Sequence, residues 1–279
     1  MLNVIGVTML IAIAVLAIWS GFRASRIRSS FLKWCGVGLA AVLAVAVSSA
    51  CAITIVGMVK QDARKAPVPD LKIEATLKRI ARGKALADGF CSACHSKTGT
   101  LTGGRDIGED LSVPVGSFVS SNLTPAGPLR RWSDGEIFRA IRNGIDADGR
   151  WLMIMSYTNA DKLSDEDTQA VIAYIRSLPA AGEPTPAPPD QLNLLGLAML
   201  GAGMLPSSKS VITRSNTAPP KGPTFQFGEY IVSYQDCRQC HGPRLTGGVQ
   251  GQIGPIGPDL TLVKDWKLSE FIATMRTGI

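Results

Sequence analysis

Two long apolar stretches at the start of the chain limit what the rest of it can fold into. Residues 2–19 and 34–59 are almost continuously apolar. Each is long enough to cross a bilayer as a helix, which takes roughly 17–25 residues. A domain that folds in water must therefore be built from the later part of the 279 residues, where there is room for about two domains of ordinary size.

The formal net charge of +7 is concentrated beside these stretches. Residues 1–73 carry 8 basic and 2 acidic side chains, residues 74–180 carry 13 of each, and residues 181–279 carry 8 and 7. Membrane topology explains an excess in this position better than a polyanionic partner does. We therefore expect contact with membrane lipid and no nucleic-acid partner.

The short loop between the apolar stretches contains only basic charges, namely Arg23, Arg26, Arg28 and Lys33. Positively charged short loops stay on the cytoplasmic side of a membrane. A hairpin anchor over residues 1–60 would then place everything that follows on the extracytoplasmic, periplasmic face of the cell membrane. A cleaved signal peptide is the alternative for the first stretch, although residues 1–4 lack the positive charge that such a peptide begins with.

Past the anchor, the sequence contains an internal repeat. Residues 132–145 align without gaps on residues 266–279, matching at Trp, Glu, Arg, Gly and Ile, and the Leu-Thr-Gly-Gly of residues 101–104 recurs at 245–248. Self-similarity of this kind indicates repeated structural units. The two halves are predicted to be copies of one domain.

We place the first domain at residues 74–178 and the second at residues 225–279. The Pro- and Ala-rich start of the intervening residues 179–224 predicts a linker. This linker includes an apolar stretch at residues 192–205, which is short for a membrane crossing. We expect a short helix there, packed between the domains or lying on the membrane surface, with a third membrane span as the alternative.

Helical signals dominate both copies. Ser133 and Glu136 form a capping-box pattern, and Ser164 with Asp167 marks the start of another helix. No alternating run rich in Val, Ile and Thr is long enough to suggest a sheet. The predicted fold class is all-α: an N-terminal transmembrane helical hairpin followed by two helical domains.

The residues that carry chemistry lie in two C-x-x-C-H motifs, Cys91-Ser-Ala-Cys94-His95 and Cys237-Arg-Gln-Cys240-His241. In this spacing one turn of chain presents two thiols to the vinyl groups of a haem, while the adjoining His reaches the iron. The motifs use both histidines of the chain. They predict two covalently bound haem c groups, with His95 and His241 as iron ligands.

Zinc and a redox disulfide are the alternatives for these motifs. A structural zinc site needs four ligands, and each copy offers three. A Cys-x-x-Cys disulfide of the thioredoxin kind occurs in a strand–helix context that neither motif has. Haem attachment also explains why the surrounding sequence is repeated.

The sixth iron ligand must be another residue type, because both histidines are already assigned. Met is the usual choice in c-type cytochromes, and the first domain offers Met153 and Met155. A filled sixth position favours an electron carrier with no catalytic residues of its own. An open iron would indicate a dihaem enzyme such as a peroxidase, or a gas sensor, which is the alternative function.

Five motifs resemble the cytochrome c subunits of membrane-bound alcohol, gluconate and related dehydrogenases: Ser121-Asn-Leu-Thr-Pro125, Trp132-Ser-Asp-Gly-Glu136, Asp148-Gly-Arg150, Met155-Ser-Tyr157 and Leu163-Ser-Asp-Glu-Asp167. The resemblance covers residues 75–178 well and residues 225–279 in part. It implies class-I-like cytochrome c domains, and it implies Met155 as the sixth ligand, because the Met of the family's Met-Pro-Tyr turn maps there. Ser156 stands where the family has Pro.

The resemblance also implies an electron-transfer role, with single electrons passing between redox protein partners in a membrane-bound respiratory or dehydrogenase complex. Those subunits commonly carry three haem motifs and a C-terminal anchor, whereas this chain has two motifs and an N-terminal hairpin. The identity of the partner is therefore not carried over. The internal alignment places the counterpart of Met155 beyond Ile279, so we expect the second domain to be C-terminally incomplete and the natural chain to continue.

Overall fold

The computed structural model describes residues 2–62, 64–185, 190–205, 209–250 and 256–278. They form two compact units. The first comprises Met1–Tyr157 with Asp167–Arg214, and the second comprises Thr158–Glu166 with Ser215–Ile279. These limits differ from the predicted boundaries in three places: residues 158–166 belong to the second unit, whereas the hairpin and the first part of the predicted linker belong to the first.

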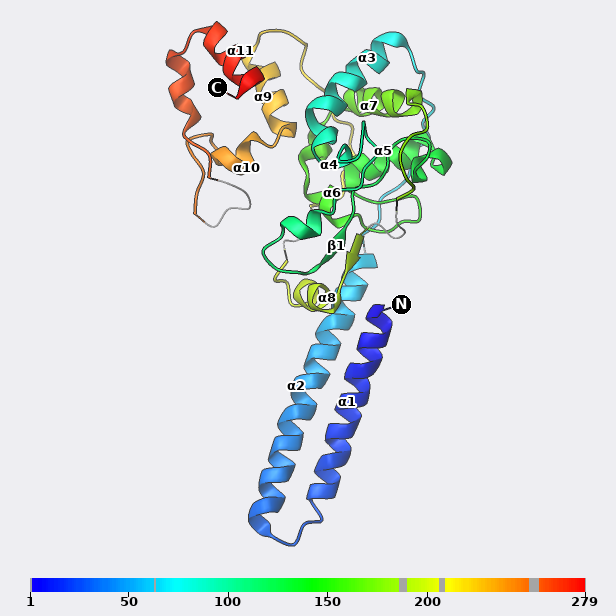
Figure 1. The fold of residues 1–279 in the computed structure, drawn as a ribbon, viewed down its shortest axis with the longest axis vertical. Helices are drawn as coiled ribbons and strands as arrows, with labels where there is room; N and C mark the ends of the chain where they lie inside the picture. The colour runs from blue at the N-terminus through cyan, green and yellow to red at the C-terminus, as the bar shows by residue number, and fades with distance from the viewer. Residues whose placement is uncertain (1, 63, 186–189, 206–208, 251–255, 279) are drawn as a thin grey trace. The chain divides into compact units, whose positions relative to one another are not determined.

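The hairpin consists of α1 (Leu2–Ala24) and α2 (Ser30–Asp62), which lie side by side (Figure 1). Small residues let the two backbones come close: a Cβ on Gly36 would lie 2.9 Å from the Cβ of Ala24. Most large apolar side chains of both helices are exposed on the outside of the pair. By length and composition both helices are able to cross a membrane.

In the first unit, α3 (Leu77–Leu86) crosses α7 (Asp165–Ser177) at close range. The contact is at Gly83, where a Cβ would lie 1.8 Å from the carbonyl oxygen of Ala170. A bidentate pair beside it joins the Arg82 guanidinium to the Asp167 carboxylate at 2.7 Å for each bond. Charge-assisted pairs of this geometry are the stronger kind and fix the crossing of the two helices.

The capping box predicted at Ser133 and Glu136 is confirmed at the start of α5 (Asp134–Asn143). The helix ends at Gly144, whose φ of 61° lies in the left-handed region that glycine adopts without strain. The chain then continues into α6 (Met153–Tyr157), which packs against α5. Because α6 packs against α5, the methionines of α6 lie beside α5.

The predicted all-α fold class is confirmed, with one small addition. Among the described residues, β1 (Gly116–Phe118) and β2 (Asp190–Leu192) pair as a two-stranded antiparallel sheet of three residues each. Strands this short leave no alternating pattern in a sequence. They bring α8 (Leu194–Gly201), the helix expected in the linker, into the first unit.

The helix α8 packs against the C-terminal part of α2, and the two backbones touch. A Cβ on Gly57 or on Gly201 would lie 1.9 Å from a carbonyl oxygen of the other helix. The Lys60 ammonium donates to the carbonyl oxygens of Leu200 and Gly201 at 3.2 and 3.1 Å, where α8 ends. Because α8 has only eight residues, or about 12 Å of helix, it is far too short for a third span.

The second unit contains α9 (Phe225–Tyr234), α10 (Cys237–His241) and α11 (Leu268–Thr277). Tyr230 and Tyr234 of α9 are buried and meet edge to face, with ring centroids 5.2 Å apart. No residue of α11 is buried in the described structure. The helix therefore exposes most of its apolar side chains, among them Leu268 and Met275.

Candidate functional site

The first C-x-x-C-H motif lies on one continuous turn of helix. The end of α3 widens into a π-helical turn at Ala87–Cys91, and α4 (Ser92–His95) follows at once. Such π turns inside α-helices are frequent at functional sites. The π turn and α4 together place Cys91, Cys94 and His95 on one continuous stretch of helix.

The backbone around His95 fixes which of its ring nitrogens can bind a metal. Its Nδ1 lies 2.8 Å from the carbonyl oxygen of Ser121. A carbonyl oxygen can only accept, so Nδ1 carries the proton and Nε2 keeps its lone pair. Histidine ligands of metals are almost always held in this way by a second partner. Burial also lowers the pKa of His95, which keeps the imidazole neutral and able to bind.

The second motif is built in the same way on α10. The Nδ1 of His241 lies 2.8 Å from the carbonyl oxygen of Pro258, which stands two residues before a Leu-Thr pair, as Ser121 does. Nε2 of His241 is thus also the free nitrogen. The repeat seen in the sequence therefore extends to the hydrogen bond that orients each histidine.

The loops that follow the two motifs share an unusual backbone. Leu101 and Leu245, at equivalent positions, have φ of 56° and 61°, values that a bulky side chain rarely adopts. Each carbonyl oxygen accepts from the Leu of the Leu-Thr pair, at 2.8 Å from Leu123 and 2.9 Å from Leu260. A strained residue kept in both copies marks a loop whose shape matters at a functional site.

The arrangement of the cysteines and of the adjoining imidazole is compatible with haem attachment. All six cysteines lie in the described part of the chain, and none forms a disulfide. Burial raises the pKa of the Cys91 thiol to about 12, so the unbound thiol is protonated at neutral pH. Two thiols on one helical turn beside an imidazole remain suited to a haem.

The two methionines of α6 have different surroundings. Met153 is 4 % exposed and belongs to a hydrophobic core with Phe118, Trp151 and Leu197. Met155 is half-buried and lies outside that core. Since Met153 is committed to packing between β1 and α8, Met155 is the better candidate for a ligand.

Ser156 stabilises this turn in a way that the family's Pro could not. Its backbone N–H donates to the carbonyl oxygen of Leu152 at 2.9 Å. Its hydroxyl donates to the Met153 carbonyl oxygen and accepts from Trp151 Nε1, both at 2.7 Å. The loss of the rigid Pro next to Met155 is thus offset by three hydrogen bonds.

Replacing Ser156 with Ala is expected to destabilise the first unit by about 1–3 kcal/mol, because the buried Trp151 Nε1–H loses its acceptor. Ser177 offers a matched control, since its hydroxyl also donates to the carbonyl three residues earlier, at 2.7 Å, but no buried donor depends on it. Ser177→Ala should cost less than about 0.5 kcal/mol. Denaturant titration of both variants measures the difference, and equal losses would contradict the role given to Ser156.

The sequence pattern predicted the motif residues and Met155 as candidates, but it missed the groups that orient the two histidines. The carbonyls of Ser121 and Pro258 belong to the main chain, so no side-chain pattern identifies them directly. The repeated Leu-Thr pair two residues later was the available signal. Met275, the methionine of the described second unit, lies on α11 with 69 % of its surface exposed.

Comparisons with known proteins agree with this geometry. A model of the cytochrome c family matches residues 80–179. The chain is 32% identical over 183 residues to one of the subunits of nicotinate dehydrogenase from Pseudomonas putida, covering 62% of this chain and 15% of the relative. It is 28% identical over 210 residues to the cytochrome c subunit of alcohol dehydrogenase (quinone) of Gluconobacter oxydans, covering 72% and 42%.

A diheme cytochrome c-type protein of Cereibacter sphaeroides is 25% identical over 214 residues, covering 68% of this chain and 70% of the relative. The chain spans less than half of the length of the other two relatives. The resemblance to cytochrome c subunits of dehydrogenases that the motifs indicated is confirmed. The turn at Cys91–His95 lies within the range that matches the model, so residues 80–179 are similar to cytochrome c around the first C-x-x-C-H motif.

Proposed function

We propose that this chain is a membrane-anchored dihaem c-type cytochrome that passes single electrons between extracytoplasmic redox partners, as a subunit of a respiratory or dehydrogenase complex. The observation that carries the proposal is the repeated site: two C-x-x-C-H turns, each with its histidine Nδ1 held 2.8 Å from a backbone carbonyl oxygen. A bound haem would supply the one-electron chemistry. The protein binds and orients it and sets the electrostatics around it.

In each site the residues have separate roles. Cys91 and Cys94, and likewise Cys237 and Cys240, would form the thioether bonds, and His95 and His241 would bind iron through Nε2. Met155 would complete the first site from α6, and a thioether ligand favours ferrous iron and so raises the potential. The relative named as a diheme cytochrome supports two haems in this chain.

The alternative is a dihaem enzyme or gas-binding sensor with an open iron. An open iron would lie in the second unit. Met155 would fill the first site, whereas Met275, in the described part of the second unit, is exposed on α11. Carbon monoxide binding to the reduced protein separates the two functions. A carrier keeps both irons closed, whereas an enzyme or sensor binds the gas at one of them.

The proposed topology places both haem sites outside the cytoplasm. The basic loop between α1 and α2 favours the cytoplasmic side, and Trp19 and Trp34 flank it with Arg23 and Lys33 over their rings at 4.8 and 5.9 Å. Aromatic residues of this kind gather at the membrane–water interface. The two relatives named as dehydrogenase subunits support a redox partner in a complex.

A spectroscopic redox titration of the purified protein tests the function. We expect two haem groups per chain, each titrating as a one-electron couple, and no carbon monoxide complex at the first site. A protein that contains zinc in place of haem, or whose haems do not take up electrons reversibly, would refute the proposal.

A further inference from the structure

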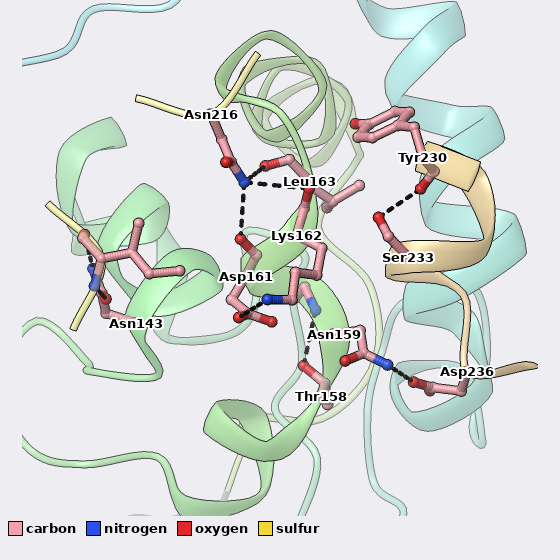
Figure 2. A network of polar contacts seen from close by, with 12 residues as sticks. Asn143, Thr158, Asn159, Asp161, Lys162, Leu163, Asn216, Tyr230, Ser233 and Asp236 are labelled. Carbon is pink, nitrogen blue, oxygen red and sulfur yellow. Dashed lines mark hydrogen bonds and ion pairs between the residues drawn. The ribbon is translucent and has the colours of Figure 1, made fainter. Parts of the chain in front are cut away.

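The segment that follows the Met155 turn is built into the second unit. The Asn216 side-chain amide donates to the carbonyl oxygens of Asp161, Lys162 and Leu163 at 3.2, 3.3 and 3.2 Å, as Figure 2 shows in part. One amide thus caps the end of the short 3₁₀ turn Asn159–Lys162. The residues just after Tyr157 therefore belong to the second unit.

Two further contacts hold the same segment. The Ser164 backbone N–H donates to the hydroxyl oxygen of Tyr230 at 2.9 Å, and Tyr230 is buried on α9. The Asp165 carboxylate accepts from the Ser215 hydroxyl at 2.6 Å and from the Asn216 N–H at 3.1 Å. The segment is thus fastened at several points along residues 158–166.

The first residues of this segment reach the attachment helix of the second motif. The Asn159 amide donates to Asp236 Oδ1 at 2.9 Å, and the two side chains point towards one another in Figure 2. Asp236 directly precedes Cys237, the first residue of α10. The Gln239 amide donates to the same oxygen at 3.2 Å. A carboxylate next to the haem-attachment turn is therefore held by two amide donors.

We propose that Asn159 is a positioning residue of the second haem site, which orients the Asp236 carboxylate beside Cys237 and offsets its charge. This inference rests on the proposed function, since it needs a haem on Cys237 and Cys240. Through Asn159, the segment 158–166, which starts three residues after Met155, influences the potential of the second haem. A residue from the sequence range predicted for the first domain thus contacts the residue that precedes the second motif.

The sign of the effect follows from electrostatics. An ionised carboxylate near the iron favours the ferric state, which carries one more positive charge, and a donated hydrogen bond partly neutralises that carboxylate. Removing the Asn159 amide leaves the Asp236 charge less compensated. The potential of the second haem is then expected to fall while that of the first stays unchanged.

A double-mutant cycle on the full-length holoprotein tests this. Asn159→Ala should shift the electron distribution between the haems towards the first by about threefold, or ~30 mV for a one-electron couple, at the lower end of couplings between hydrogen-bonded neighbours. In an Asp236→Asn background, Asn159→Ala should have no effect. Asn216→Ala is the control, because it loosens the same segment without removing a donor to Asp236, and any effect it has should be the same in both backgrounds.

The outcomes separate the inference from the function on which it rests. Two haems per chain with an unchanged second potential in Asn159→Ala, or a shift that persists with Asp236→Asn, would overturn the role of Asn159. A protein without haem on the second motif would overturn the proposed function, and the role of Asn159 with it. A shift confined to the second haem and abolished by Asp236→Asn supports the inference.

Discussion

Replacing Cys91 and Cys94 together with Ala is expected to halve the covalently bound haem, from two groups per chain to one. The pair Cys237→Ala and Cys240→Ala should do the same, because each motif attaches its own haem. A haem-stained denaturing gel with a haem-to-protein ratio measures the loss. Covalent attachment survives denaturation, so the gel detects the attached haem directly.

The chain supplies its own matched control for this experiment. Cys35 and Cys51 lie on α2, outside both motifs, and neither forms a disulfide. Replacing both with Ala should leave two haems per chain. If these replacements also lowered the haem content, or if a motif variant kept both haems, the assignment of the motifs would be wrong.

Replacing Met155 with Leu is expected to lower the potential of one haem and to open its iron to added ligands. A thioether ligand stabilises ferrous iron, and axial ligands move haem potentials over about 0.8 V, so we expect a fall of at least ~100 mV. Leu keeps the apolar volume of Met, which limits the effect on packing. Redox titration and carbon monoxide binding measure both changes.

Met153→Leu is the matched control two residues away. Met153 is buried among Trp151, Leu197 and their neighbours, so its replacement should cost less than about 1.5 kcal/mol of stability and leave the potential unchanged. The reverse pattern, with the potential falling only in Met153→Leu, would show that the ligand is Met153. If the potential fell in neither variant, that result would contradict methionine ligation of the first haem.

The sequence alone predicted the features that depend on local patterns. The capping box of Ser133 and Glu136, the two apolar helices and the helical character of both copies follow from hydrogen bonding and hydropathy over a few neighbouring residues. The haem motifs are equally local, because two thiols and an imidazole must lie on one turn of chain. The duplication of these motifs can be recognised in the sequence for the same reason.

The tertiary structure decided what depends on residues far apart in the chain. The pairing of β1 with β2 joins three-residue strands more than 70 positions apart, which carry no local signal, and it makes α8 part of the first unit. Likewise, the hydrogen bonds from Asn216 and Asn159 assign residues 158–166 to the second unit, although the sequence placed them within the first domain.

The same division holds within the site. The spacing predicts His95 and His241 as iron ligands, but the tautomer of each histidine depends on a carbonyl oxygen, 26 residues away along the chain for His95 and 17 for His241. Met153 and Met155 are alike in the local pattern, and only the core formed by β1, β2, α6 and α8 separates a packing methionine from a candidate ligand. Local chemistry thus determined which groups can bind a haem, and long-range packing determined how they are oriented, because orientation requires partners that the chain reaches only after folding.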